Sequence, residues 1–185
     1  MTDREILLDL LGDFAGSLHW TIKDLPPSVL RWQPDTEANS IGVTVWHICR
    51  SFDVLGARIL QNRLHTAEIW HTAGWAKRTG YDPHGIGFAG WGTLARFTRA
   101  EVEAIPTLSA AALLQYLGQT VDVLHTHLEG ITPEMLYQPP AGWPDITHSR
   151  YEPETAYCAH SRHPDGYART PTGEIKTLRG MWERL

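Results

Sequence analysis

The sequence predicts an all-α fold, a four-helix bundle forming one domain over residues 1–185. Three observations support this prediction. Apolar residues recur at intervals of three and four in several long segments, as they do on one face of a helix. The composition, 42% hydrophobic and 20% charged, is typical of a globular protein. A chain of 185 residues is also long enough to bury a core of its own.

The first two helices are defined by apolar periodicity and by residues that start or stop helices. The first is expected over residues 3–24, where a row of apolar side chains shares one face. Leu25–Pro27 ends it, because proline cannot continue a helix. The second is expected to begin after Ser40, a favourable N-cap, and to run to about Arg63.

The second half of the bundle is preceded by a glycine-rich stretch over residues 72–92, which predicts an irregular surface excursion. The third helix is expected after the N-cap residue Ser109 and should end by Gly130. Similar proline-started turns over residues 25–34 and 132–139 follow the first and third helices. Their similarity indicates a pseudo-symmetric pairing of the two halves.

The fourth helix is harder to place from the sequence. Residues 152–163 and 173–185 each look helical, but Pro164, Gly166 and Pro171 lie between them. A proline inside a helix removes a hydrogen bond and costs about 3 kcal/mol. We therefore do not expect one continuous fourth helix.

Charge, hydropathy and cysteine content exclude several classes of function. The net charge is -5 and the basic residues are scattered, so nucleic acid is not an expected partner. No run of 18 apolar residues exists and the N-terminus lacks the features of a signal peptide, which predicts a cytoplasmic protein without membrane contact. Cys49 and Cys158 lie far apart and outside any CxxC spacing, so neither a disulfide framework nor a thiolate zinc site is expected.

The ten histidines include three that could carry chemistry. His47 falls in the middle of the second predicted helix, beside its apolar stripe, where it is either a hydrogen-bonded boundary residue or part of a site. His160 and His163 are three apart, so on a helix their imidazoles share one face and could bind one metal, or both could be exposed. The histidines and the glutamate repeated at intervals of three over residues 65–71 are interpreted as surface residues.

Several short motifs resemble the DinB/YfiT-like superfamily. Residues 30–34, Ser40–Gly42 and Trp46–Ile48 resemble the first half of its pattern, and Gly173–Ile175 with Leu178–Gly180 resembles its C-terminal signature. The resemblance covers nearly the whole chain in the order of its elements. It implies a four-helix bundle in which three histidines hold a divalent metal, commonly zinc or nickel. It also implies a thiol-dependent transferase or isomerase that uses a low-molecular-weight thiol.

The same resemblance assigns residues to the site. His47 matches the first metal ligand, and Glu174 would lie near the metal as an acid or base, or as a group that orients a ligand. A metal held by three ligands leaves a position where water or a thiol loses its proton near neutral pH. The other two family ligands fall on Tyr167 and Pro171. Tyrosine is a poor substitute for imidazole, and the side chain of proline cannot bind a metal.

Three explanations of this mismatch stay open. His160 and His163 could have replaced the family ligands, if the chain folds back toward His47. Alternatively the site is degenerate, and the bundle binds a small molecule or a partner without metal. A third explanation is a compensated frameshift over residues 150–172, where the family likeness fades before it returns at Gly173.

The leading prediction is a metal-dependent, thiol-using transferase or hydrolase that acts on a small-molecule substrate. Its metal ligands would be His47, His160 and His163, with Glu174 as the catalytic carboxyl group. The alternative is a non-catalytic bundle that binds a small molecule or dimerises. The eight tryptophans would suit an aromatic interface in such a homodimer.

Overall fold

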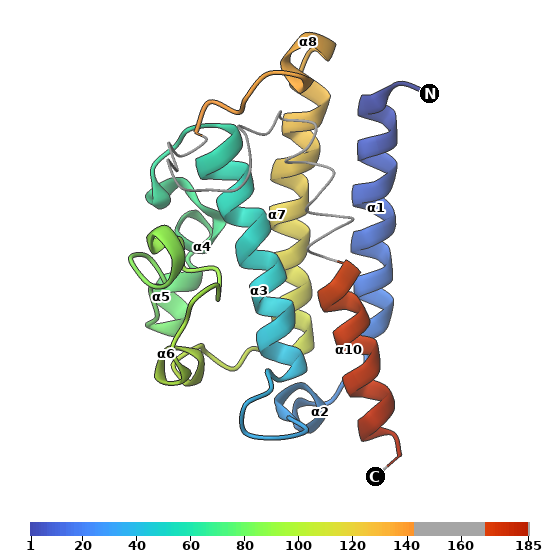
Figure 1. Ribbon diagram of the computed structural model, residues 1–185, viewed down its shortest axis with the longest axis vertical. Helices are drawn as coiled ribbons and strands as arrows, with labels where there is room; N and C mark the ends of the chain where they lie inside the picture. The colour runs from blue at the N-terminus through green and yellow to red at the C-terminus, as the bar shows by residue number, and fades with distance from the viewer. Residues whose placement is uncertain (143–168, 185) are drawn as a thin grey trace.

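The computed structural model describes residues 1–142 and 169–184, which are helical and contain no strand. Figure 1 shows four long helices running side by side. Helix α3 packs against α7, α1 packs against α7, and α10 packs against both α3 and α1. The predicted four-helix bundle is therefore confirmed. Its helices are α1 (Asp3–Ile22), α3 (Ile41–Val54), α7 (Ala110–Gly130) and α10 (Arg169–Trp182).

Hydroxyl side chains cap the N-termini of three of the long helices. Thr2 and Glu5 form a reciprocal capping box at the start of α1. The Ser40 and Ser109 hydroxyl groups each accept a hydrogen bond from a backbone N–H three residues further on. Both predicted serine caps are confirmed. Helix α3 then continues into a π-helical turn, η1 (Leu55–Leu60), so the second helical segment ends three residues earlier than predicted.

The two proline-started turns are also present. They form α2 (Pro27–Arg31) and α8 (Pro133–Leu136), each with proline at its first position and each following a long helix of the bundle. Both turns bury aliphatic side chains, including Leu30 and Leu136. The repeated sequence pattern therefore corresponds to a repeated local structure.

The expectation that Pro171 lies between helices is wrong, because α10 begins at Arg169 and includes this proline. Residues 152–168, with Pro164 and Gly166, lie outside the described residues, so the expectation of a discontinuous fourth helix stays a prediction. The first N–H groups of a helix have no partner within the helix, so a proline in the first turn removes no hydrogen bond. The remainder of α10 buries Ile175 and Leu178. Arg179 joins α10 to α1, donating a hydrogen bond of 3.0 Å to the Thr21 carbonyl oxygen.

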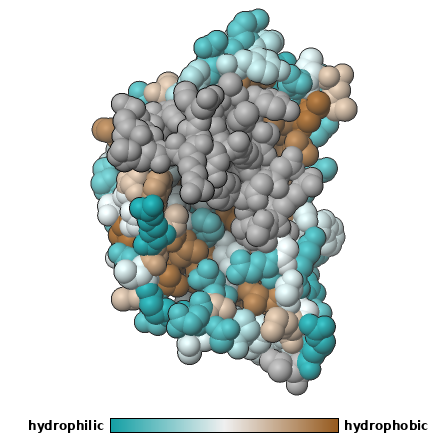
Figure 2. All heavy atoms as spheres, in the orientation of Figure 1, coloured by the Kyte–Doolittle hydropathy of each residue, from teal (hydrophilic) through white to brown (hydrophobic). Residues whose placement is uncertain are grey.

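The chain between η1 and α7, residues 61–109, is called the excursion below; it contains the predicted glycine-rich stretch 72–92 and covers one side of α3 in Figure 1. The irregular backbone predicted over 72–92 is present, but the expectation that this stretch lies at the surface is wrong for Trp75, which is buried. Trp70 and Glu68, which precede the stretch, are buried as well. Figure 2 shows apolar surface where the excursion adjoins α3. The excursion contains α4 (Ile69–Thr72), α5 (Trp75–Thr79), α6 (Arg99–Glu103) and two 3-10 turns, His65–Ala67 and Phe88–Gly90.

Across the described parts of the chain, none of the helices has both the length and the apolar character needed to cross a lipid bilayer. The longest one, α7, is amphipathic. It presents a buried stripe that includes Leu113, Leu117 and Leu124 to the other helices, while Asp122 and His125 are exposed.

Candidate functional site

Helix α3 holds His47 at its midpoint, where the imidazole is half-buried between the bundle and the excursion. Burial lowers the pKa of His47, and a hydrogen bond with the Thr93 backbone opposes this only in part. The Ser51 hydroxyl lies 3.5 Å from Nδ1. His47 is therefore neutral at pH 7, with one nitrogen that carries a proton and one that does not.

The loop that contains Thr93 is held by Arg50, which lies one turn after His47 on α3. The Arg50 Nε atom donates to the Gly92 carbonyl oxygen at 3.3 Å, and Nη2 donates to the Trp91 carbonyl oxygen at 3.2 Å. Two consecutive carbonyl groups of the excursion, those of Trp91 and Gly92, thus accept hydrogen bonds from one side chain of α3.

The Arg50 guanidinium is fully buried and all five of its N–H groups have acceptors. Besides the two carbonyl oxygens, it donates to Asp53 at 3.2 Å, to the Tyr116 hydroxyl at 3.3 Å and to Glu68 at 2.9 Å. Asp53 is 3% exposed and Glu68 is 1% exposed. Buried ions are stable only when they are paired and hydrogen-bonded in this way. Arg50, Asp53, Glu68 and Tyr116 are called the Arg50 cluster below.

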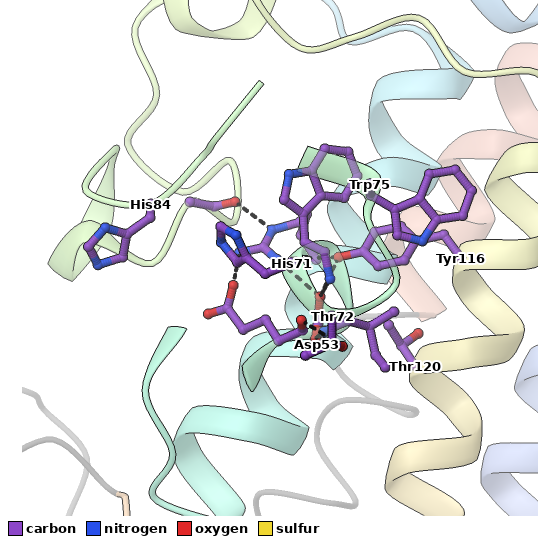
Figure 3. Close-up of polar contacts among 12 residues, drawn as sticks. Asp53, His71, Thr72, Trp75, His84, Tyr116 and Thr120 are labelled. Atoms are coloured by element: carbon purple, nitrogen blue, oxygen red, sulfur yellow. Dashed lines mark hydrogen bonds and ion pairs between the residues drawn. The ribbon is translucent and has the colours of Figure 1, made fainter. Parts of the chain in front are cut away.

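Asp53 connects three parts of the structure. Figure 3 shows it among the polar contacts, with Tyr116 reaching it from α7. It accepts hydrogen bonds from the Tyr116 hydroxyl at 2.7 Å and from the backbone N–H groups of Ile69 and Trp70 at 2.6 and 2.8 Å. Burial raises the pKa of Glu68, an effect that the Arg50 charge opposes. The Arg50 cluster therefore fastens the excursion to α3 and α7.

The sequence interpretation missed the Arg50 cluster. A usable signal was present, since Arg50 and Asp53 lie three apart within an otherwise apolar helix and charged residues are seldom buried unless paired. The prediction that the residues over 65–71 are surface residues is wrong for Glu68. His71 is also largely covered, and its Nε2 atom lies 3.5 Å from an Asp82 carboxylate oxygen.

The structure places only part of the predicted metal site. Among the described residues, no three His, Cys, Asp or Glu side chains are arranged to hold a metal ion. His160, His163 and Tyr167 lie outside the described residues. Pro171 is in the first turn of α10. The described chain thus supplies one donor, the His47 imidazole, whose neutral form is the one that metals bind.

Glu174, the predicted catalytic carboxyl group, is an exposed residue of α10. It precedes Ile175, which is buried where α10 packs against the bundle. Partial burial of the carboxyl group raises the pKa of Glu174. A carboxyl group with a raised pKa holds a proton more readily, as a general acid requires.

Cys49 lies in the core and is not a candidate nucleophile. Its side chain is fully buried, and Sγ donates a weak hydrogen bond of 3.8 Å to the Leu113 carbonyl oxygen. Burial, together with the nearby Asp53 carboxylate, raises the pKa of the Cys49 thiol far above its usual range. Thiolate, not thiol, is the reactive form, so this cysteine is inert in the folded protein.

The buried, protonated state of the Cys49 thiol predicts that it reacts slowly in the folded protein. In a Cys158→Ser variant, Cys49 is expected to stay unmodified by a disulfide-exchange reagent over a period in which the urea-unfolded chain reacts completely. The reaction can be followed by the absorbance of the released thiol. Rapid stoichiometric reaction of the native variant at pH 7 would contradict the buried, protonated state.

Comparisons with known proteins agree with this fold. A family model described as the DinB superfamily matches residues 15–168. The matched range contains His47, His160 and His163 and ends before Gly173. A solved structure described as a conserved protein from Enterococcus faecalis is similar over 97% of this chain and 96% of that one, with a TM-score of 0.76 and 15% sequence identity. That likeness shows the fold alone. No curated protein sequence matches the chain.

Proposed function

Because the chain belongs to the DinB superfamily, we propose that it is a metal-dependent, thiol-using transferase or hydrolase that acts on a small-molecule substrate. One observation carries the proposal. His47 stands near the centre of α3 as a half-buried imidazole whose lowered pKa keeps it neutral at pH 7. The neutral imidazole is the form that binds metals.

The metal would be zinc or nickel, both of which bind imidazole well. We propose His47, His160 and His163 as its ligands, since the family match includes all three positions. The bound metal would lower the pKa of a thiol or water placed on it. Glu174 would hold and transfer a proton. The thiol would be a low-molecular-weight co-substrate, as the family resemblance implies; Cys49 is buried and protonated and does not supply it.

A second function is favoured by one observation. The family's remaining ligand positions carry Tyr167 and Pro171, and the proline lies in the first turn of α10 without a side-chain donor. If no other residues replace those ligands, the bundle is a metal-free module that binds a small molecule or forms a dimer. A measurement of metal binding distinguishes this metal-free module from the proposed metal-dependent enzyme.

The proposed ligand set can be tested by calorimetric titration of zinc and of nickel into protein purified without a metal-binding tag and treated with a chelator. The parent protein should bind one ion per chain, and the His160→Ala, His163→Ala double variant should lose that binding. His125→Ala is the matched control, because His125 is an exposed histidine of α7. Full binding by the double variant would refute the ligand set. No binding by the parent protein would favour the metal-free module.

A further inference from the structure

Three histidines of the excursion lie in contact with one another, in a group that the proposed function does not use. The imidazole rings of His65 and His84 stack face to face, with centroids 3.6 Å apart and planes 17° from parallel. The His71 ring meets the His65 ring edge-on, at a centroid distance of 5.5 Å. The Nε2 atom of His71 lies 3.5 Å from a carboxylate oxygen of Asp82. His65, His71, His84 and Asp82 are called the histidine cluster below.

The histidine cluster joins two segments of the excursion, residues 65–72 and the loop over residues 82–92. Within this loop, the Gly92 backbone N–H donates to the Ile86 carbonyl oxygen at 3.0 Å. Ala89 has a φ of 51°, in the left-handed region that residues other than glycine disfavour. Backbone of this kind persists only where surrounding contacts determine it. The histidine cluster is therefore one of the contacts that keep the loop ordered.

The charges around the histidine cluster can accommodate one added proton. The Asp82 carboxylate can neutralise one imidazolium, and it lies beside His71 Nε2, which has no hydrogen-bond partner in the described parts of the chain. Figure 3 shows His71 close to the Arg50 cluster, with His84 further from it. A first proton is therefore stabilised between His71 and Asp82.

Further protons are not accommodated in the same way. A second one charges His65 or His84 within the same set of touching rings, and a third charges both rings of the stack. Like charges at such separations repel. Arg58 adds to this repulsion at His65, and the Glu68 carboxylate, 3.9 Å from Arg58, is already bound within the Arg50 cluster. Partial burial and the neighbouring His84 and His71 rings lower the pKa of His65 accordingly.

Proton uptake and release of the loop favour each other. A histidine whose pKa is lower in the packed arrangement binds more protons once the arrangement opens, so acid favours the open form. We propose that the histidine cluster is a pH-sensitive contact: it holds the loop over residues 82–92 against residues 65–72 while its imidazoles are neutral, and it releases the loop as they take up protons. Release should begin near the ordinary pKa of histidine, about 6.5, and increase as the pH falls.

The loop continues at its far end to Trp91 and Gly92, which Arg50 binds on α3 one turn from His47. Release of the loop at acid pH would therefore change access to that part of α3. Only this consequence rests on the proposed function. The pH-sensitive contact itself is a property of the metal-free protein.

The proposal can be tested by hydrogen–deuterium exchange of chelator-treated protein at pH 5.5 and 7.5, with each rate corrected for the intrinsic effect of pH on exchange. Amide protection over residues 82–92 should be about tenfold lower at pH 5.5, because one pKa unit between two states corresponds to a tenfold change in their equilibrium. Protection of α7 should stay the same at both pH values. The comparison with α7 distinguishes release of the loop from unfolding of the whole protein.

His84→Phe is the main test variant, because phenylalanine keeps an aromatic ring in the stack but takes up no proton. Since His84 is exposed, the substitution should not endanger the fold. The variant should lose most of the pH dependence, whereas the matched control His125→Phe, at an exposed histidine of α7, should behave as the wild type. Burial also raises the pKa of Glu68, so Glu68 is a second group that acid could protonate. Its effect would persist undiminished in His84→Phe.

A permanent charge at the same position tests the opposite direction. His84→Lys and His84→Gln both remove the stacked ring, but only lysine places a positive charge beside His65 and Arg58. At pH 7.5 the lysine variant should therefore show lower protection over residues 82–92 than the glutamine variant.

Any of the following results would overturn the inference. The wild-type loop could be equally protected at both pH values, or α7 could lose protection together with the loop. The His84→Phe variant could retain the full pH dependence of the wild type. The lysine and glutamine variants could be equally protected at pH 7.5. None of these results depends on whether the protein binds a metal, so the proposed function and this inference can fail separately.

Discussion

Replacing Asp53 with alanine is expected to lower the free energy of unfolding by about 3–5 kcal/mol, because it leaves the buried Arg50 charge without one of its two partners. The substitution also removes the acceptor for the Ile69 and Trp70 backbone N–H groups and for the Tyr116 hydroxyl. Buried donors without acceptors retain their full cost of desolvation. The loss should therefore far exceed that of removing an ordinary ion pair.

This expectation is checked by urea unfolding followed by circular dichroism. Glu103→Ala is the control, because it breaks the exposed Arg99–Glu103 ion pair, whose atoms are 2.8 Å apart, and should cost less than about 1 kcal/mol. Asp53→Asn retains one carbonyl oxygen and should fall between the two. If Asp53→Ala costs no more than Glu103→Ala, the Arg50 cluster does not stabilise the fold in the way described.

The second large effect is expected at His47. His47→Ala should abolish metal binding while the helical circular dichroism stays close to that of the parent protein, since alanine is the best helix former. The more informative variant is His47→Gln. Its side-chain amide is polar and can donate and accept hydrogen bonds, but it lacks the imidazole nitrogen that binds metal.

His47→Gln should therefore lose the metal and keep most of the stability. A variant that unfolds at much lower urea concentration, yet retains its metal, would show that His47 is a structural residue. Within α3, Asp53 is thus expected to determine the stability of the fold, and His47 is expected to determine metal binding.

Local features of the sequence predicted most of the fold. Helix periodicity and the Ser40 and Ser109 caps are decided by residues within one or two turns, so they could be found without knowing the tertiary structure. The error at Pro171 has a local cause as well. The proline was taken to lie between helices, whereas α10 begins two residues before it, and proline is harmless in a first turn.

The Arg50 cluster could not be predicted in the same way, because its contacts join distant parts of the chain. Arg50 is 18 residues from Glu68 and 66 from Tyr116, and no helical periodicity relates them. The many glycines of the excursion are typical of a surface loop, so the sequence did not indicate that the excursion buries the Glu68 carboxylate and the indole rings of Trp70 and Trp75. What the sequence did offer was a pair of charges, Arg50 and Asp53, in an apolar helix.

The candidate site was predicted in part. His47 was identified from its place in the second helix and from the family resemblance, and the structure adds the Ser51 hydroxyl beside Nδ1 and the lowered pKa of the imidazole. The roles of His160, His163 and Glu174 as parts of one site remain proposals. For the two histidines this reflects their position outside the described residues. For Glu174, the exposed position on α10 is compatible with either proposed function.

The most direct test of the central claim, that His47 is the anchor of a metal site, is elemental analysis of protein purified without a metal-binding tag, with His47→Gln prepared alongside. The account predicts about one zinc or nickel ion per chain in the parent protein and none in the variant. A parent protein without metal, or equal metal in both proteins, would contradict it.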